Sequence, residues 1–367
     1  MSAVVIGGGM VGAACADALA RRGHRVTLVE RACVGGGATA AGMGHLVVMD
    51  DSPAQLALTS RSLELWEALA PALPAQAEYR PCGTVWVASD GEEHRGVLPK
   101  QALYQAAGRE AVMLDAAELS RLEPGLRSGL SGGLRVPGDG VVYAPVAAQF
   151  LVERSGAQVV AGEVTRIEAG GVCLRDGRRL NADLVVLAAG IGAKALLPEL
   201  PLRERKGHLL ITERGAATVR HQLVELGYLK NAHGNDLDSV AFNVQPRPTG
   251  QLLIGSSRQF GQPGPDLDYP LLRRMLARAT EFLPSLPQFS ALRVWTGQRC
   301  AAPDHLPIVG WHPQREGLFL AVGHEGLGIT TALGTAELLE HALGGPDTPL
   351  AAYGLGFERF AAGVAHA

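Results

Sequence analysis

The sequence predicts an α/β fold that opens with a strand, a glycine-rich turn, a helix and a second, parallel strand. Residues 2–6 form a short apolar run, and residues 7–12 are rich in glycine. Apolar residues at helical spacing continue over 11–22, and a second apolar run covers 25–29. A glycine turn that leads from a strand into a helix is typical of a parallel sheet.

Two later segments are expected to join the same sheet. Residues 183–190 are a buried apolar run that ends in a glycine turn, as a central parallel strand does. Residues 317–322 form another strand, which leads into a second glycine-rich turn over 323–328. We expect a helix to follow from 329 to 343.

The first glycines have the spacing G-x-G-x-x-G, supplied by Gly7, Gly9 and Gly12. Such glycines permit a sharp turn, close approach of a pyrophosphate and tight helix–strand packing, while the helix N-terminus faces the phosphates. Glu30, 18 residues beyond Gly12, stands where a carboxylate accepts hydrogen bonds from a ribose. The pattern therefore predicts a dinucleotide site, against the alternative of an ordinary glycine-rich turn. It does not separate NAD from FAD.

Composition and charge exclude several classes of protein. The chain has 367 residues, 47 of them glycine, and its length and 47% hydrophobic content predict two globular domains. Its 33 basic and 36 acidic residues give a net charge of −3 without charge blocks, so we expect no nucleic-acid partner. Five scattered cysteines predict reduced thiols, no metal site and a cytoplasmic location. We expect no membrane span, and peripheral membrane association stays open.

The segment 31–45 is a long run of small residues that we expect to form a loop without a packed element. Such a loop is able to wrap a flat ring. With the other motifs, it resembles the D-amino-acid oxidase family of flavoproteins, in the branch of glycine oxidase, sarcosine oxidase and bacterial D-amino acid dehydrogenases. The matching segments are residues 7–12, Glu30-Arg31, residues 37–39, residues 183–190, and 297–299 with Gly323-His324 and Gly328. Residues 42–53 look most like the flavin subunits of D-hydroxyproline dehydrogenases.

This resemblance spans nearly the whole chain and implies a buried, extended FAD. The positions that it implies for the cofactor are Gly7, Gly9, Met10, Val11 and Gly12 at the pyrophosphate; Glu30 and Arg31 at the adenosine ribose; Val164 at the adenine; Ala189 and Gly190 close by; Thr39, Gly42, Met43 and Gly44 at the ribityl chain and flavin ring; and Gly326, Leu327, Gly328 and Ile329 at flavin N1 and C2. Backbone N–H groups and a helix N-terminus at the last four would stabilise the reduced, anionic flavin edge. The alternative for them is a plain buried turn.

Oxidation of an amino acid by a flavin needs a clamp for the substrate carboxylate and a Cα–H directed at flavin N5. An arginine is the best clamp because its planar guanidinium pairs with both oxygens. Arg299 occupies the place where glycine oxidase-like members carry this arginine. The alternative for Arg299 is a surface or interdomain ion pair.

Further candidates for the substrate site are polar. Residues 240–245 and 251–256 predict a hairpin that carries three of them. The histidines beside the flavin loops have a pKa near neutrality, so they are candidates to orient the amine or take its proton, or else structural residues. The candidates are Asn243, Gln245 and Arg258 on the hairpin, His45 and His324 beside the loops, Glu325 as a partner for an ammonium group, and Tyr228 as a closing residue.

Cys300 neighbours Arg299 but does not lie where sarcosine oxidase-like members tether their flavin, which here falls near Gly297. We therefore expect FAD to bind non-covalently. The resemblance divides the chain into a discontinuous Rossmann-like FAD-binding domain, from residues 1–77, 142–201 and 295–367, and an α+β substrate domain with a mixed sheet, from 78–141 and 202–294.

Two functions follow from this interpretation. The first is FAD-dependent oxidation of the C–N bond of a small amino acid, such as D-hydroxyproline, D-proline, another D-amino acid or glycine, to an imine. Oxygen or another electron acceptor then takes the electrons, and an enzyme that uses oxygen produces hydrogen peroxide. The second is a flavoprotein subunit that needs partner chains for electron transfer. The sequence leaves open a homo-oligomer and a heteromeric complex, and a NAD-binding protein is the third, less favoured possibility.

Overall fold

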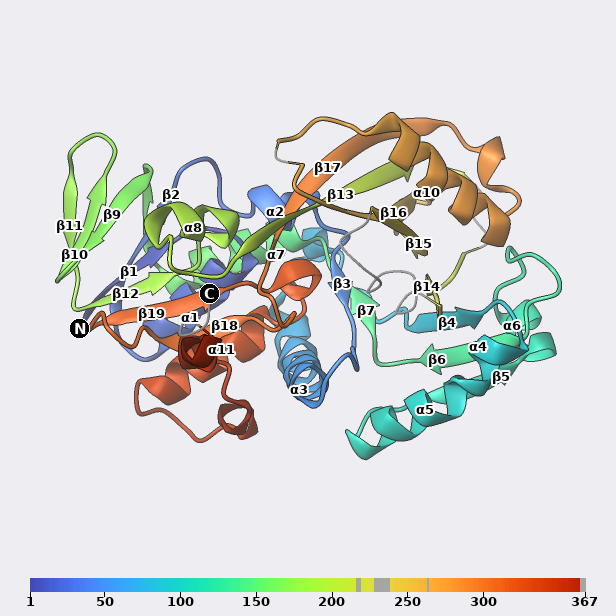
Figure 1. Ribbon diagram of the computed structural model, residues 1–367, viewed down its shortest axis with the longest axis horizontal. Coiled ribbons are helices and arrows are strands. Elements are labelled where there is room, and N and C mark those ends of the chain that lie inside the picture. Colours follow the sequence, from blue (N-terminus) through green and yellow to red (C-terminus); the bar gives the residue numbers. More distant parts are fainter. Residues whose placement is uncertain (216–218, 228–237, 263, 364–367) are drawn as a thin grey trace.

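The computed structural model describes residues 1–215, 219–227, 238–262 and 264–363. Residues 361–363 are described by their backbone only. Figure 1 shows two halves, each built on one large sheet. We call them the parallel-sheet half, which contains both ends of the described chain, and the mixed-sheet half.

The parallel-sheet half contains a six-stranded sheet in the order β18-β19-β12-β1-β2-β8. All neighbours in it are parallel except β18, which is antiparallel to β19. The strands predicted at residues 2–6, 25–29, 183–190 and 317–322 are all confirmed as members. The bounds are β1 (Ser2–Ile6), β2 (Arg25–Glu30), β8 (Gln158–Ala161), β12 (Leu184–Leu187), β18 (Ile308–Trp311) and β19 (Leu318–Val322).

Alternate residues of β1 bury themselves in two different cores, because side chains alternate across a strand. Ala3 and Val5 belong to a core shared with four helices, whereas Val4 and Ile6 belong to a core shared with a small antiparallel sheet. The four helices are α1 (Met10–Arg21), α3 (Pro53–Leu69), α7 (Ala144–Ser155) and α11 (Ala332–Ala342), and the second core is covered by β9 (Val164–Glu168), β10 (Gly171–Leu174), β11 (Arg179–Asn181) and α8 (Ala193–Leu196).

The mixed-sheet half contains an eight-stranded sheet in the order β17-β13-β16-β15-β14-β4-β6-β5. The predicted hairpin is confirmed as β15 and β16, and helix α10 (Tyr269–Phe282) packs on it through Met275 and Phe282. The sheet's bounds are β4 (Thr84–Ala88), β5 (Val112–Asp115), β6 (Gly132–Val136), β13 (Arg203–Thr212), β14 (Gln222–Glu225), β15 (Ser239–Pro246), β16 (Leu252–Phe260) and β17 (Ala291–Ala301).

The predicted domain boundaries stay a proposal, which the membership of the mixed sheet supports. Seven of the eight strands of this sheet lie within 78–141 and 202–294, and the eighth, β17, crosses the boundary after 294. Shorter elements complete the two halves. They are α2 (Gly37–Ala41), β3 (His45–Leu46), α4 (Gly91–Arg95), α5 (Val97–Ala106), α6 (Ala116–Leu122) and β7 (Gly140–Val141).

Two local predictions were wrong. The segment 31–45 is not a loop throughout, because α2 forms where small residues pack closely on β17, with Gly297 beside Ala41. The helix expected from residue 329 begins at Ala332 instead, after a 3₁₀ turn at Glu325–Leu327. Thr331, rather than Gly328, precedes the helix. Pattern alone rarely places a helix start within a few residues, because the preceding turn is also helical in spacing.

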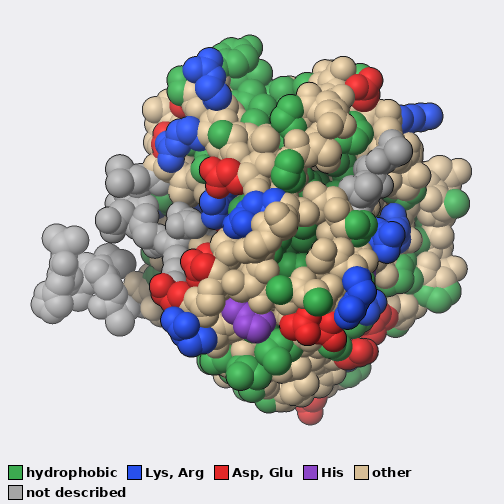
Figure 2. Space-filling view, turned by 90° about the vertical axis from the view of Figure 1, so that its right-hand side faces the viewer, with side chains coloured by type: hydrophobic (Ala, Val, Ile, Leu, Met, Phe, Trp, Pro, Cys, Tyr) green, Lys and Arg blue, Asp and Glu red, His purple; other side chains and the backbone are tan. Residues whose placement is uncertain are grey.

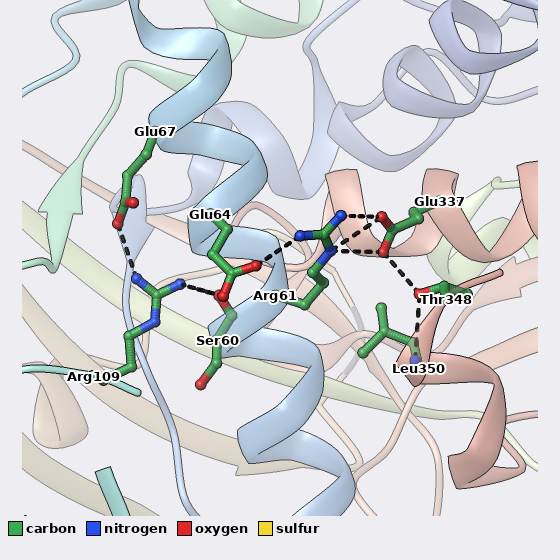
Figure 3. A network of polar contacts seen from close by, with 8 residues as sticks. All are labelled: Ser60, Arg61, Glu64, Glu67, Arg109, Glu337, Thr348 and Leu350. Atoms are coloured by element: carbon green, nitrogen blue, oxygen red, sulfur yellow. Dashed lines mark hydrogen bonds and ion pairs between the residues drawn. The ribbon is translucent and has the colours of Figure 1, made fainter. Parts of the chain in front are cut away.

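Charged side chains on α3 connect the two halves (Figure 3). Arg61 points toward Glu337 on α11, and its Nη2 lies 2.6 Å from that carboxylate. On the other side of α3, Glu67 accepts from Arg109, which follows α5 in the mixed-sheet half, at 2.9 Å. Helix α3 thus contacts α11 on one side through Arg61 and the mixed-sheet half on the other side through Glu67. The residues just before α3 therefore lie between the two halves.

Acidic and basic side chains are interspersed on the face of the mixed-sheet half in Figure 2. Among the residues that the structure describes, no helix is both long and apolar enough to cross a membrane.

Candidate active site

The predicted dinucleotide turn brings backbone against backbone. Gly7 has φ +104°, and a Cβ on Gly12 would lie 1.9 Å from the Gly7 carbonyl oxygen. A Cβ on Gly9 would lie 3.2 Å from Thr39 Oγ1. Only glycine fits Gly12, so the start of α1 stays open to a ligand that approaches the backbone. Met10 and Val11 form the first turn of this helix.

Glu30 ends β2 and holds the two loops beside it. Its Oε2 accepts from the Gly8 N–H at 2.7 Å, and its Oε1 accepts from the Ala32 N–H at 2.8 Å. The carboxylate therefore faces the glycine turn, as the predicted ribose contact requires.

A first cavity of about 770 Å³, partly open to solvent, lies beside Glu30. Its wall includes Gly7, Glu30, Arg31, Val164 and Ala189, which come from four separate segments. The structure thus brings together every residue predicted for the adenosine part except Gly190, which lies in the 3₁₀ turn Gly190–Gly192 just after Ala189.

The segments predicted for the flavin lie along one path from the glycine turn. The Met10 N–H donates to Thr39 Oγ1 at 2.9 Å. A Cβ on Gly42 would lie 3.0 Å from Ile329 Cδ1, and one on Gly328 would lie 3.8 Å from Val11 Cγ2. The second glycine turn therefore lies beside the first and beside the end of α2.

Met43 and Gly44 connect this path to both halves. Met43 is buried with Leu209 and Leu253 of the mixed sheet. Gly44 has φ +82°, and a Cβ there would lie 1.9 Å from the Val142 carbonyl oxygen. A side chain at position 44 is therefore excluded, which keeps the chain close as it enters β3.

A second cavity, of about 700 Å³ and partly open to solvent, lies at the other end of this path. Four predicted residues of the second glycine turn, His324, Glu325, Gly326 and Leu327, form part of its wall, as do His45, Asn243 and Arg258. The remaining wall residues are Val47, Met49, Asp51, Gln55, Thr84, Trp86 and Val224. The wall thus combines one guanidinium, two amides, two carboxylates and two imidazoles with apolar side chains.

Glu325 is the centre of a charged cluster at this wall. It forms ion pairs with Arg205, with His305 at 3.2 Å and with Arg258 at 4.0 Å. Burial opposes ionisation of Glu325, but the hydrogen bond from His305 and the charges of Arg258, Arg205 and Arg299 hold its pKa well below its usual range. Three guanidinium groups thus act on this one carboxylate.

Glu325 and His305 both have a left-handed backbone, with φ of +50° and +61°. Non-glycine residues adopt this conformation seldom, and at functional sites the surrounding contacts hold it in place. Here each side chain holds the other. The hydrogen bond that His305 donates to Glu325 raises the pKa of His305.

His45 is held from both sides by amides. Its Nδ1 contacts Gln222 Oε1, and its Nε2 lies 3.1 Å from Asn243 Nδ2. Burial lowers its pKa, against the hydrogen bonds that it forms with Gln222 and Asn243, so the neutral form is favoured. Both ring nitrogens already have partners.

His324 is also neutral. Burial lowers its pKa to about 4, and its Nε2 lies 2.9 Å from Thr335 Oγ1 on α11. Either histidine would have to give up a contact, or use the remaining nitrogen of His324, in order to take a proton from a substrate.

Arg299 lies behind the wall of the second cavity. Its Nη1 donates to the Ser257 carbonyl oxygen at 3.3 Å, and its guanidinium fills the space above Gly207. Its charge lowers the pKa of Glu325 and of His45, so it is close to both.

The other candidates are distributed differently. Gln245 is fully buried outside the cavity and accepts from Arg247 at 3.3 Å. Tyr228 lies outside the described residues. Cys300 is buried, which raises its pKa to about 12. The thiol is therefore protonated at neutral pH.

Sequence reasoning missed Gln222, Arg205 and His305. Gln222 begins β14, a short strand with no motif, and reaches His45 only because β14 pairs with β15 and β4. Arg205 and His305 meet Glu325 across 120 and 20 residues of sequence. No local pattern marks these contacts.

The two halves, the glycine turn and the carboxylate at the end of β2 define a dinucleotide-binding oxidoreductase. The profile of the family described as "FAD dependent oxidoreductase" (DAO) matches residues 2–342. The chain therefore belongs to this family, and it is an FAD-dependent enzyme. The glycine turn of residues 7–12, which has no room for a Cβ at Gly12, and the first cavity beside it both fit this cofactor.

Individual relatives agree with the family. The chain is 28% identical to the glycine oxidase of Geobacillus kaustophilus (strain HTA426), with 92% of each sequence covered. The crystal structure of glycine oxidase from Geobacillus kaustophilus superposes with a TM-score of 0.85 at 26% identity, covering 97% of this chain and 98% of the other.

Two relatives come from Pseudomonas aeruginosa (strain PAO1). Hydrogen cyanide synthase subunit HcnC is 27% identical, with 95% of this chain and 93% of the relative covered. D-amino acid dehydrogenase 2 is 32% identical over 63% of this chain and 56% of its own length. These relatives confirm a flavin enzyme similar to glycine oxidases and D-amino acid dehydrogenases.

Proposed function

We propose that the chain oxidises the C–N bond of a small amino acid to an imine, with D-proline, D-hydroxyproline, another D-amino acid or glycine as substrate. The observation that carries this proposal is the pair of guanidinium groups at the second cavity, where Arg258 forms part of the wall and Arg299 lies close to the wall residues Glu325 and His45. A carboxylate is the ligand that such a pair of guanidinium groups binds best.

The rest of the wall limits the size and polarity of the substrate. Trp86, Val224, Val47 and Met49 form the apolar part of this wall. A small aliphatic side chain or a five-membered ring buries its carbon atoms there, at about 0.8 kcal/mol per CH₂ group.

When bound, FAD supplies the acceptor for the hydride that leaves the substrate Cα. We propose that residues 7–12, Glu30 and Arg31 hold its adenosine diphosphate portion, and that residues 39–44 and 326–329 hold its ribityl chain and ring. The backbone contacts among these segments support that assignment. Position 297 is a glycine and the thiol of Cys300 is protonated, which supports non-covalent binding.

The substrate reacts as a neutral amine, so a proton must leave it before or during hydride transfer. We infer that solvent takes this proton rather than His45, because both nitrogens of His45 are already hydrogen-bonded. The wall residues Asp51 and Gln55 also line an adjoining surface cavity that contains Asp304 and His305, which provides a route to water.

The test mixes the FAD-loaded enzyme, without oxygen, with glycine, sarcosine, D-alanine, D-proline or D-hydroxyproline. Reduction is measured as the loss of the absorption of oxidised flavin. At least one amino acid should bleach it within seconds. If none does, the proposed reaction is wrong.

Arginine variants identify the carboxylate clamp. Arg258→Met and Arg299→Met should each raise KM for the reducing amino acid by about 10- to 100-fold, because each removes a charged hydrogen bond worth about 1.5–3 kcal/mol. Arg273→Met, on the surface side of α10, is the control. An unchanged KM in one variant would assign the clamp to the other arginine.

A second candidate function, the flavin subunit of a heteromeric dehydrogenase, is supported by the similarity to a relative that is itself described as a subunit. Peroxide formation and dye reduction, measured side by side with the same amino acid, distinguish an oxidase from a subunit of a heteromeric dehydrogenase. An oxidase forms peroxide at the rate of substrate loss. A subunit reduces its flavin but turns over only with a dye or partner chains.

A further inference from the structure

The orientation of the Gln222 amide is determined by its surroundings. Its Nε2 donates to the Gly140 carbonyl oxygen at 2.7 Å and lies 3.4 Å from Thr84 Oγ1. A flipped amide would place Oε1 against the Gly140 oxygen, with two acceptors facing each other. The side chain is fully buried, so water cannot compensate for that repulsion. Gln222 therefore presents Oε1, an acceptor, to His45.

This acceptor selects the tautomer of His45. Because Gln222 Oε1 has no hydrogen to give, His45 Nδ1 must carry the proton and donate it. In the neutral imidazole, Nε2 is then a bare acceptor. The group that faces Nε2, at 3.1 Å, is the Asn243 side-chain amide.

His45 in turn determines the orientation of Asn243. Since His45 Nε2 accepts, Asn243 must turn Nδ2 toward it, and Asn243 Oδ1 lies on the other side. Asn243 is 8% exposed and forms part of the wall of the second cavity. Its Oδ1 has no hydrogen-bond partner among the residues that the structure describes. A buried amide oxygen without a partner costs about 1–3 kcal/mol, which a bound ligand with an N–H group would recover.

We propose that Asn243 Oδ1 binds the amine N–H of the substrate, and that Gln222 acts through His45 as the positioning residue that keeps this oxygen turned away from His45. The inference rests on the proposed function, because it assumes an amino acid in the second cavity. It adds a division of the site: the arginines recognise the carboxylate, and Asn243 recognises the nitrogen. His45 is a link in this chain rather than a base.

Gln55 offers the contrast needed for a test. It also forms part of the cavity wall, is 6% exposed, and has a side-chain oxygen without a partner among the described residues. However, no contact fixes which end of its amide faces the cavity. Gln55→Leu is therefore the matched control for Asn243→Leu, since each removes one amide from the same wall.

The experiment compares ligand pairs that differ by the nitrogen. The FAD-loaded enzyme is titrated with whichever amino acid reduces it, and separately with the matched acid in which carbon or hydrogen replaces nitrogen. The pairs are glycine and acetate, D-alanine and propionate, and D-proline and cyclopentanecarboxylate. KM is measured for the amino acid, and Kd for the acid is measured from the change in flavin absorption.

Asn243→Leu should raise KM for the amino acid by about 10- to 100-fold and leave Kd for the matched acid within about twofold. Gln55→Leu should change both constants alike or neither. Bound FAD and circular dichroism verify folding, and Asn243→Ala replaces Asn243→Leu if that variant does not fold.

Gln222→Leu tests the positioning role from outside the cavity. Without the Oε1 acceptor, the His45 tautomer with Nε2–H becomes available, and it would turn Asn243 Oδ1 away from the ligand. We expect KM for the amino acid to rise about 10-fold with an unchanged Kd for the acid. The ¹⁵N shifts of labelled histidine should show the proton moving from Nδ1 to Nε2, with His45→Gln identifying the signals.

The two failures are distinguishable. If no amino acid reduces the wild-type flavin, the proposed function is wrong and the inference falls with it. If an amino acid reduces it but Asn243→Leu weakens both members of a pair equally, or neither, only the inference is overturned. An unchanged histidine tautomer in Gln222→Leu would overturn the role of Gln222.

Discussion

The two halves form their binding surfaces from different parts of the chain. In the parallel-sheet half the surface is mainly backbone: glycines approach other backbone so closely that a Cβ at Gly12 or Gly44 would lie 1.9 Å from a carbonyl oxygen. In the mixed-sheet half it is side chains that come from neighbouring strands, such as Arg258, Asn243 and Gln222, and the last two both hold His45. A backbone surface leaves a glycine signature in the sequence, whereas a side-chain surface leaves none.

The largest expected effect tests the backbone surface. Gly12→Ala places a Cβ against the Gly7 carbonyl oxygen, and neither group is able to move without displacing β1 or α1. The cost should reach about 3 kcal/mol, and we expect the purified variant to contain less than a tenth of the normal FAD. The ratio of flavin to protein absorbance measures this.

Gly91→Ala, at the start of α4 in the mixed-sheet half, is the matched control, because its Cβ would meet only the Arg95 side chain at 3.9 Å. It should keep its FAD. A Gly12→Ala variant with full FAD would show that FAD binding does not depend on the close backbone contact at Gly12. The proposed difference between a backbone surface and a side-chain surface would then be wrong.

The next effect tests the side-chain cluster. Glu325→Gln removes a carboxylate on which Arg205, Arg258 and Arg299 all act. It should lower the free energy of unfolding by about 3–5 kcal/mol, because a buried ion pair loses one partner. Thermal or urea unfolding of the FAD-loaded protein measures this. Glu163→Gln, which breaks the exposed pair with Arg175, should have no measurable effect.

The pH dependence of this loss has a definite sign. The pKa of Glu325 is lowered in the folded state, so its contribution is present above its ordinary value of 4.5 and is lost as pH falls through the folded value. Wild type and Glu325→Gln should therefore converge in stability at acid pH. Equal stability at neutral pH would show that the cluster does not stabilise the fold.

The sequence predicted the backbone surface better than the side-chain surface. Glu30 and the glycines of residues 7–12 were predicted because their neighbours in sequence are also their neighbours in space. Arg258 and Asn243 were found through the hairpin that carries them. Gln222 was missed because its partner His45 lies 177 residues away, and the left-handed backbone of Glu325 depends on a contact with His305 that no propensity encodes.

A smaller effect tests the junction between the halves. Asp139 follows β6 in the mixed-sheet half and accepts from the Val48 N–H at 3.0 Å, in the strand-like segment that forms the cavity wall. Burial raises its pKa from 3.8 to about 7, against hydrogen bonds from Thr84 and Val48 and the charges of Arg109 and Lys100. The folded protein therefore holds a proton there that the unfolded chain has released.

Stability should consequently fall as pH rises from about 4 to about 7, by at most about 1.4 kcal/mol per pH unit from this group, and stay level above that range. Asp139→Asn keeps the acceptor for Val48 and should remove this slope. Urea midpoints at several pH values, with Asp90→Asn on the surface as control, measure the difference. Identical slopes in wild type and Asp139→Asn would contradict the buried proton.

The smallest effect sharpens the contrast, because it concerns a side chain that supports the backbone surface. Helix α1 has no capping side chain at Gly9, and Thr39 Oγ1, 29 residues away, accepts from the Met10 N–H instead. Thr39→Val keeps the shape but leaves this N–H unpaired, which costs about 1 kcal/mol. We expect FAD to bind about fivefold more weakly, as measured by titration of the apoprotein, and Thr39→Ser to restore the affinity. If Thr39→Val binds FAD normally, the α1 N-terminus is positioned by its glycines alone, and the division between backbone and side-chain recognition is sharper than the structure implies.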